Sequence, residues 1–388
     1  MKMRLACAIA AAAVVAPGMT QGNGPFDPLL EGGAMCGPPS SRQPAVLRAL
    51  ILAKTETTPF QPVAPVPAMS EAPKLYPNLG TLRFKAGTQS GRAQQWFDQG
   101  VRLSFAFNHA EAQRAFREAQ KIDPACALCY WGEALVLGPN VNVPMMPEAN
   151  APALAALEKA MALAKSAPSR DRALIEALST RYSADPSAPR SKLDAAYAQV
   201  MAEVAKTYPE DTVLTLYAEA MMDAQPWDYW EGGGEKPKGN GAAIVETLEN
   251  VLARDPSHPG AIHLYIHAVE ASTRPERALP YASRLAAQMP GAGHIVHMPA
   301  HIYYRVGLYR ESLDANRKAI GVDERYFRTS PSDPLYKAAY YPHNIHFLMV
   351  SAQMGGEART ALGAAAKLDA SMPVDLVRQF AIMQPVKA

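Results

Sequence analysis

Residues 93–124 read AQQWFDQGVRLSFAFNHAEAQRAFREAQKIDP, two helical segments joined by a short turn. Gly100 and Ala112 are small enough to let two helices approach closely, and Phe116 is large enough to fill the space between them. Pro124 ends the second segment because proline has no backbone N–H to continue a helix. The stretch therefore predicts a pair of antiparallel helices.

The pair is one unit of a longer array. Its fold-determining residues occupy the spacings of the 34-residue tetratricopeptide (TPR) pattern, namely Trp96, Gly100, Ala112, Phe116, Ala119 and Pro124. The period recurs along the chain, with later units ending at Pro168, Pro209, Pro256, Pro290 and Pro373; the clearest later copy is YYRVGLYRESLDANRKAI at residues 303–320. These repeats predict an all-α fold, a right-handed α-solenoid of about seven TPR-like helix-turn-helix repeats over residues 91–388. The first helix of each pair lines its concave groove.

The N-terminal residues predict export. Residues 1–22 contain the basic start MKMR, a short apolar run and then Pro17 and Gly18, which is typical of a secretory signal peptide. We therefore expect a periplasmic or secreted protein with no membrane span in the mature chain, because no later apolar run reaches about 18 residues. Residues 23–90 are rich in proline and glycine and are expected to wrap or link rather than form a core of their own.

Charge and cysteine content narrow the possibilities further. Lys and Arg total 38 against 36 Asp and Glu, so nothing favours nucleic acid as a partner. Export leaves Cys36, Cys126 and Cys129, and an oxidising compartment would allow a Cys126–Cys129 disulfide. Two packed thiols are the alternative. The GxxxxGK, GxGxxG, HExxH and GxSxG motifs are absent, which disfavours nucleotide, dinucleotide, zincin and serine-hydrolase chemistry.

Three stretches interrupt the repeat period, at residues 139–150, 225–241 and 328–341. The second carries Trp227, Tyr229 and Trp230 beside three consecutive glycines. It fits either an aromatic flap on a flexible hinge or an aromatic plug packed against the edge of the solenoid.

Histidines give the strongest indication of function. Seven of the nine recur at helical spacing in three successive repeats, where they share the groove-facing positions two, five and nine of the first helix: His263, His267, His294, His297, His301, His343 and His346. Neutral imidazoles with few carboxylates favour a transition-metal site for copper or zinc. Glu270 and Tyr304 follow His267 and His301 on the same faces, and either could act as a ligand, a base or an orienting group.

Two functions follow from this pattern. The first is a metal site with one or two ions, which would support metal-centred oxidation or hydrolysis if the protein is an enzyme. The second is a TPR scaffold that binds a protein or peptide partner in its concave groove without metal. The metal hypothesis requires imidazole nitrogens within roughly 4 to 5 Å of a common point, given metal–nitrogen bonds of about 2 Å.

Four residues near the histidines have separate interpretations. Pro299 is expected to kink its helix between His297 and His301, or merely to fit the curvature of the solenoid. Met298 should point toward the packed interior. His109 lies at the first inter-helix turn and is expected to be structural. His258, between two prolines, is expected to cap a helix or to lie outside the ligand set.

Several blocks carry a resemblance to a known family, among them DPACALCYWGEALVLGPNVN, HPGAIHLYIHAVEAS, GAGHIVHMPAHIYYRVGLY and PHNIHFL. Together with AQQWFDQGVRLSFAFNHAEAQRAF, they resemble exported bacterial tetratricopeptide-repeat proteins with histidine-rich C-terminal repeats. The resemblance extends from about residue 76 onward. It implies an all-helical repeat fold and a bacterial envelope setting, and it assigns no activity.

Overall fold

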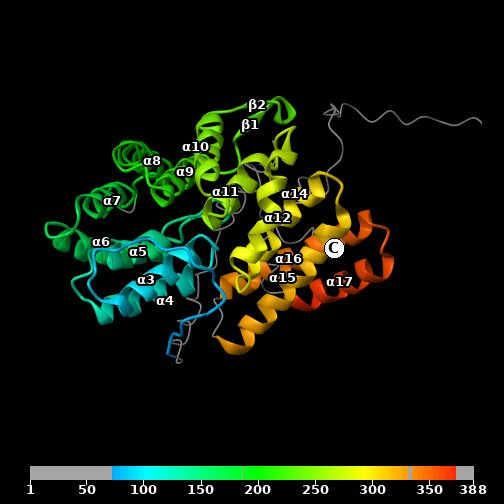
Figure 1. Cartoon of the computed structure of the whole chain (residues 1–388), viewed down its shortest axis with the longest axis horizontal. Coiled ribbons are helices and arrows are strands. Elements are labelled where there is room, and N and C mark those ends of the chain that lie inside the picture. Colours follow the sequence, from blue (N-terminus) through cyan, green and yellow to red (C-terminus); the bar gives the residue numbers. More distant parts are fainter. Residues whose placement is uncertain (1–71, 186, 331–333, 373–388) are drawn as a thin grey trace, which may run out of the picture.

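The computed structural model describes residues 72–185, 187–330 and 334–372, and this part of the chain is almost entirely α-helical (Figure 1). The α-helices are α3 (Gly91–Ser104), α4 (His109–Ile122), α5 (Ala127–Leu137), α6 (Asn150–Ala164), α7 (Ser169–Ser179), α8 (Arg190–Thr207), α9 (Asp211–Ala224), α10 (Gly241–Arg254), α11 (Pro259–Val269), α12 (Leu279–Gln288), α13 (Gly293–His297), α14 (Pro299–Arg305), α15 (Tyr309–Thr329), α16 (Pro334–Met354) and α17 (Ala358–Ser371). Short 3-10 turns are η1 (Pro147–Ala149), η2 (Gly232–Gly234) and η3 (Pro275–Ala278), and β1 (Trp230–Glu231) pairs antiparallel with β2 (Lys236–Pro237). The prediction of an all-α fold is confirmed.

Packing of the first helices follows the sizes of their side chains. The ring of Phe116 on α4 lies against both Gly100 on α3 and Gly132 on α5, since a Cβ atom added at either glycine would lie 2.5 Å from it. Phe116 is fully buried, and Trp96 is nearly so. Glycine at these two positions therefore sets how closely α3, α4 and α5 approach one another; the sequence predicted this for Gly100.

The predicted unit boundaries coincide with helix ends. Pro124, Pro209, Pro256 and Pro290 lie between consecutive helices, and a fifth, Pro168, directly precedes α7. Each helix from α3 to α17 packs against the next one in the chain. Pro373, the signal peptide and Cys36 lie outside the described residues.

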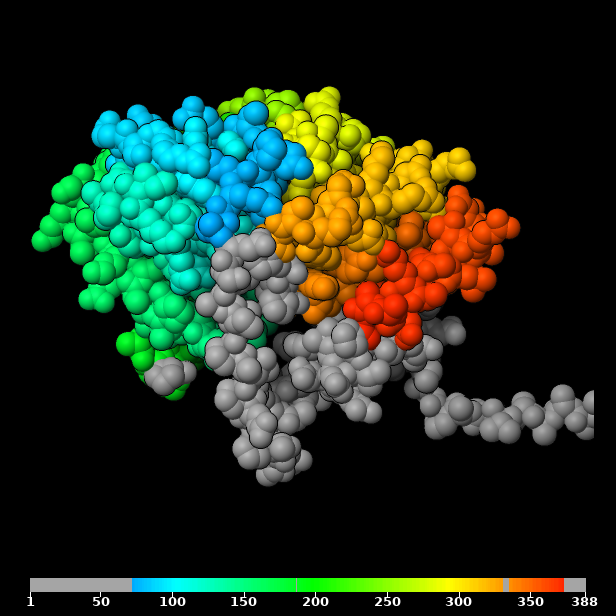
Figure 2. Space-filling view, turned by 90° about the horizontal axis from the view of Figure 1, so that it is seen from below, coloured from blue at the N-terminus to red at the C-terminus, as the bar shows by residue number. Residues whose placement is uncertain are grey.

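The segment before α3 connects distant parts of the helical body. Its Tyr76 hydroxyl donates to Ser330 Oγ at 2.8 Å, and its Asn78 carbonyl accepts from Gly291 N at 2.8 Å. Phe84 is buried in the same core as α3 and α4. Figure 2 shows these first described residues, in blue, against the orange end of α15. Residues 72–90 therefore contact helices that lie far apart in the sequence.

Contacts between α4 and α15 bring the first and late helices together. Tyr326 Oη and Ser330 Oγ donate to Glu111 Oε2 at 3.1 and 3.2 Å. The turn between α3 and α4 reaches α11, where a Cβ atom at Gly260 would lie 2.7 Å from the ring of Phe105. The helical array therefore curls until its first turn packs against its later helices.

The segment that interrupts the repeat period at residues 225–241 packs against the helices as an aromatic plug and does not form a flap on a hinge. Tyr229 is buried, and Trp230 Nε1 donates to the carbonyl of Ala268 at 2.7 Å. Gly234, at φ +94°, packs so closely on Ala271 O that a Cβ atom would lie 2.4 Å from it. The β1–β2 hairpin is thereby fixed to the end of α11.

The interruption expected at 328–341 was placed wrongly. α15 continues to Thr329, and α16 already begins at Pro334. Tyr336, Ala339 and Tyr340 are buried at helical spacing, so their apolar face favours a helix here, and proline is well tolerated at a first helical position.

Two further predictions concern a disulfide bond and membrane-spanning helices. Cys126 and Cys129 are joined by a disulfide at the start of α5, which decides between the two alternatives for these cysteines. Within the described ranges, no helix combines the length and apolar character needed to cross a bilayer.

Candidate metal centre

Six of the seven predicted histidines form two compact groups. The first triad comprises His263 and His267 of α11 with His294 of α13, and the second comprises His297 of α13, His301 of α14 and His343 of α16. Within each triad, one nitrogen from every ring lies within 4.8 Å of the other two. The distance criterion for a metal site is therefore met twice, at two neighbouring points rather than one.

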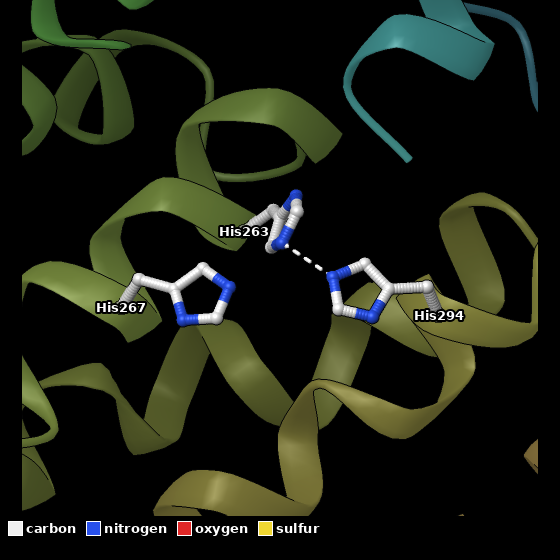
Figure 3. Close-up of side chains that lie close together, drawn as sticks. All are labelled: His263, His267 and His294. Carbon is white, nitrogen blue, oxygen red and sulfur yellow. Dashed lines mark hydrogen bonds between the residues drawn. The ribbon is translucent and has the colours of Figure 1, made fainter. Parts of the chain in front are cut away.

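The first triad directs its imidazoles inward from two helices. His263 Nε2 and His294 Nε2 are 3.1 Å apart, and His267 presents a nitrogen toward the same space (Figure 3). His267 Nε2 is buried and makes no hydrogen bond with any described residue. A buried nitrogen without a partner is costly unless a bound ion satisfies it.

The second triad is tighter and centred on one residue. His297 Nε2 lies 2.9 Å from His301 Nε2 and 3.1 Å from His343 Nε2. Two nitrogens bonded to one tetrahedral ion at about 2.0 to 2.1 Å lie roughly 3.3 Å apart. Small side-chain rotations would bring these rings to that spacing.

Hydrogen bonds on the opposite ring nitrogens fix how the imidazoles point. His263 Nδ1 donates to the carbonyl of Phe105 at 2.6 Å, and His297 Nδ1 donates to Asn316 Oδ1 at 2.6 Å. Asn316 Oδ1 is the acceptor because its amide nitrogen donates to Ser312 O at 2.7 Å. Protonation at Nδ1 leaves the lone pair on Nε2, which is the arrangement of metal-bound histidines.

Glu270, the C-cap residue of α11, holds one histidine from each triad. Its Oε1 accepts from His267 Nδ1 at 3.1 Å, and its Oε2 accepts from His301 Nδ1 at 2.6 Å. Glu270 is 5% exposed, so water competes little with the two imidazoles for its carboxylate oxygens. Among the three roles predicted for Glu270, this geometry supports orientation of two imidazoles.

The tautomers leave an unsatisfied contact in the second triad. His297 and His301 both donate through Nδ1, so in their neutral forms both Nε2 atoms carry lone pairs, and these lone pairs face each other at 2.9 Å. His343 could donate to one of them but not relieve the contact between them. A cation between the rings converts this repulsion into coordination.

Burial keeps five of the six triad imidazoles neutral. Loss of solvation is the main cause that lowers the pKa of His263 and His267 to about 3, and it lowers the pKa of His294, His297 and His343 well below the usual value. Neutral rings retain the lone pairs that a transition metal needs. At neutral pH these five rings are therefore neutral donors rather than cations.

The same burial corrects the expectation that the histidines line an open groove. All six triad residues are buried, with exposures from 0 to 6%. The inward curl of the array places the α3–α4 turn and α16 over the histidine faces of α11, α13 and α14, as the Phe105–His263 and His297–His343 contacts demonstrate. The predicted positions face inward, but the space they face is filled by protein.

His346 lies outside both triads, and the ligand role predicted for it stays a prediction. It is half-buried. On α16 the site-facing residues are Tyr340, His343 and Phe347, whose rings contact the triads. At about 100° of rotation per residue, His346 points away from the centre of that face.

Tyr304 lies beside the second triad. Its ring packs on Tyr309 at 5.3 Å and on Phe347 at 5.8 Å, and Phe347 in turn contacts His301 at 4.6 Å. A packing role is what these contacts support. The catalytic role predicted for Tyr304 stays a prediction.

The helix break at Pro299 confirms the predicted kink. α13 ends at His297 and α14 begins at Pro299, so the kink separates His297 from His301. Met298 is fully buried in the main core, as expected. His294 and His297, three residues apart on α13, belong to different triads, so this short helix supplies a ligand to each.

The other two histidines behave largely as expected. His258 caps α11, with Nδ1 accepting from Ala261 N at 3.1 Å, and its Nε2 lies 3.2 Å from Thr212 Oγ1. His109 begins α4 and packs edge-on against Phe107 at 6.2 Å. Neither belongs to a triad.

Sequence reasoning missed the residues that surround the triads from elsewhere in the chain. Phe107 packs on His263 at 4.4 Å, and Phe347 packs on all three rings of the second triad. Asn316 accepts a hydrogen bond from His297 Nδ1, and the carbonyl of Phe105 accepts one from His263 Nδ1. Phe347 was detectable, because it follows His343 by one helical turn. The contacts of Phe105 and Phe107 depend on the curl of the array, for which the sequence has no local signal.

No protein-family model matches the chain, and a search of curated proteins found no similar sequence. The arguments for function therefore rest on the geometry of the site.

Proposed function

We propose that this protein is an exported TPR-repeat protein whose two histidine triads bind two transition-metal ions. The observation that carries the proposal is the second triad, in which two Nε2 lone pairs face each other at 2.9 Å while their Nδ1 atoms donate to Asn316 and Glu270. When both rings are neutral, a buried contact of this kind is unfavourable unless a cation lies between them. A three-imidazole donor set supplies that cation's ligands.

Copper is the first choice and zinc the second. Both bind neutral imidazole, and no carboxylate belongs to either triad of the described residues, which disfavours magnesium, calcium and manganese. Three nitrogens leave room for a fourth ligand on each ion, as catalytic metal sites require. If the protein is an enzyme, its chemistry is metal-centred, and Glu270 acts by positioning His267 and His301.

Separate features support export and the TPR arrangement. The Cys126–Cys129 disulfide is typical of an oxidising compartment, and residues 1–22 have the pattern of a signal peptide. Alternate helices α3, α5 and α7 contact one another in succession, as the first helices of stacked repeats do. A periplasmic or secreted site would meet metal ions outside the cytoplasm.

Metal analysis of the purified mature protein tests the proposal. The protein is stripped with a chelator, loaded with Cu(II) or Zn(II) in separate samples, desalted and measured by mass spectrometry for metal per chain. We expect about two ions per wild-type chain and about one in His297→Ala, because one triad is removed.

His346→Ala is the matched control, since His346 lies outside both triads, and it should retain both ions. Less than one ion per chain with either metal would refute metal binding. It would instead favour the scaffold hypothesis, in which the TPR array binds a protein or peptide partner.

A further inference from the structure

A cavity of about 170 Å³ lies beside the first triad. It is bordered by the α3–α4 turn, the end of α5, the insertion at 139–149 and α16, and its walls include Phe107, Val136, Met145 and Tyr340. We propose that this cavity binds a small, neutral, phenol-sized aromatic molecule next to the first triad.

The lining identifies the class of ligand. No aspartate, glutamate, lysine or arginine is among the described residues of the wall, so a charged molecule would lose its hydration without a partner. Most of the wall is apolar, and its polar side chains are the amides of Gln113 and Asn140, the imidazole of His109 and the hydroxyl of Tyr340. Its volume is close to the roughly 150 Å³ of an apolar cavity that binds benzene. An aromatic ring with one polar substituent fits both the size and the mixed lining.

The cavity and the first triad share a wall of two aromatic rings. Phe107 lies 4.4 Å from the ring of His263 and 5.5 Å from that of His294, and Tyr340 lies 4.7 Å from His294. A molecule in the cavity is therefore separated from the metal ligands by a single layer of side chains. Aromatic rings favour stacked or edge-on contact with further aromatic rings, which adds to the affinity for such a ligand.

The strained backbone of Phe107 indicates a functional reason for an aromatic side chain at this position. It ends α3 at φ +53°, in the left-handed conformation that glycine adopts most easily at this position. Here Asn108 N bonds to Leu103 O at 3.0 Å, which closes the helix end. This conformation is unfavourable for a residue that carries a Cβ atom.

Trp227, at φ +62°, is the other described non-glycine residue with positive φ, and its ring also packs on His267, at 5.0 Å. Both strained aromatic residues therefore surround the first triad.

The inference deepens the proposed function by assigning the class of molecule that would meet the metal centre, and to that extent it rests on that function. Binding to the cavity itself does not require metal. Its test therefore separates a failure of the cavity from a failure of the metal site.

The probe is 4-fluorophenol, followed by fluorine NMR with the mature chain in metal-free, zinc-loaded and copper(II)-loaded forms. We expect saturable binding to the metal-free and zinc-loaded protein. With copper(II), the bound signal should broaden strongly, because the paramagnetic ion lies behind the shared wall. Absence of saturable binding, or binding without broadening in protein that carries copper at the first triad, overturns the inference.

Ala149→Trp fills the cavity from η1, and Ala155→Trp on the exposed face of α6 is the matched control. We expect at least about tenfold weaker probe binding in the first variant and unchanged binding in the second. Met146→Trp, at a 43% exposed wall residue, repeats the test without risk to the core. Wild-type affinity in both cavity variants overturns the inference. If the probe binds as expected and no metal does, the cavity site stands and the proposed metal function fails.

Discussion

Substitution of Glu270 by glutamine should weaken one triad and spare the other. The carboxylate accepts from His301 Nδ1 at 2.6 Å and from His267 Nδ1 at 3.1 Å, whereas a carboxamide has a single oxygen. The shorter bond should keep that oxygen, so His267 Nδ1 faces the amide nitrogen. His267 then accepts at Nδ1 and carries its proton on Nε2, where it can no longer bind metal.

The size of the effect follows from the role of such supporting groups. Loss of a carboxylate that orients a ligating histidine weakens metal binding about 10- to 100-fold. We expect this loss at the first triad, equivalent to about 1.4 to 2.7 kcal/mol. The second triad should stay within about threefold of wild type, because its bond to Glu270 is retained.

The two affinities can be measured separately. Glu270→Gln is combined with His297→Ala, which leaves only the first triad, or with His263→Ala, which leaves only the second, and each protein is titrated against a competing chelator. Glu246→Gln, at an exposed position of α10, is the matched control. Unchanged affinity at the first triad, or equal weakening of both triads, would refute the argument for selective support by Glu270.

Three further predictions concern the fold of the metal-free protein. Phe116→Ala should lower the free energy of unfolding by about 3 to 5 kcal/mol, because the ring fills a fully buried space, and a loss below 1 kcal/mol in urea titration would contradict this. Burial raises the pKa of Asp323 to about 7, so its charged form destabilises the native state, and the stability this group contributes at low pH is lost as pH rises from about 4 to about 7. Asp323→Asn should remove this component, and identical pH profiles of unfolding for variant and wild type would show that the carboxyl does not titrate as stated. Replacement of both Cys126 and Cys129 by serine should cost about 2 kcal/mol, since the disulfide closes a loop of only four residues, and calorimetry showing no change would exclude that contribution.

Helical periodicity accounts for what the sequence predicted correctly. Gly100, Phe116 and the inter-helix prolines act through contacts within a unit or with its neighbour, so their consequences are visible along the chain. The spacing of His263 to His267 placed this pair on one face of α11, whereas His297 and His301 come together from α13 and α14 across the break at Pro299. The interruption at 328–341 was misplaced because its prolines obscured the start of α16.

The division into two triads could not be read from the repeat. Equivalent positions in three repeats suggested one cluster of seven histidines, but His294 and His297 of the same helix α13 belong to different triads, and His301 of α14 joins His297. On α16 each residue is rotated by about 100° from the one before it, and His346 therefore lies beside the helix face that carries His343 and belongs to neither triad. Glu270 was identified as an orienting candidate, although its bond to His301 crosses between helices and depends on their packing.

The sequence by itself determined the helical elements and which histidines share a helix face, because both follow from the 3.6-residue period of one helix. Only the tertiary structure decided that the faces are buried, that they form two donor sets and that a cavity lies behind Phe107. These properties depend on the curl of the array, which brings the turn at residues 105–107 to helices some 150 residues later, as the Phe105–His263 bond shows. Curvature accumulates from small rotations between neighbouring units, and no short stretch of sequence records their sum.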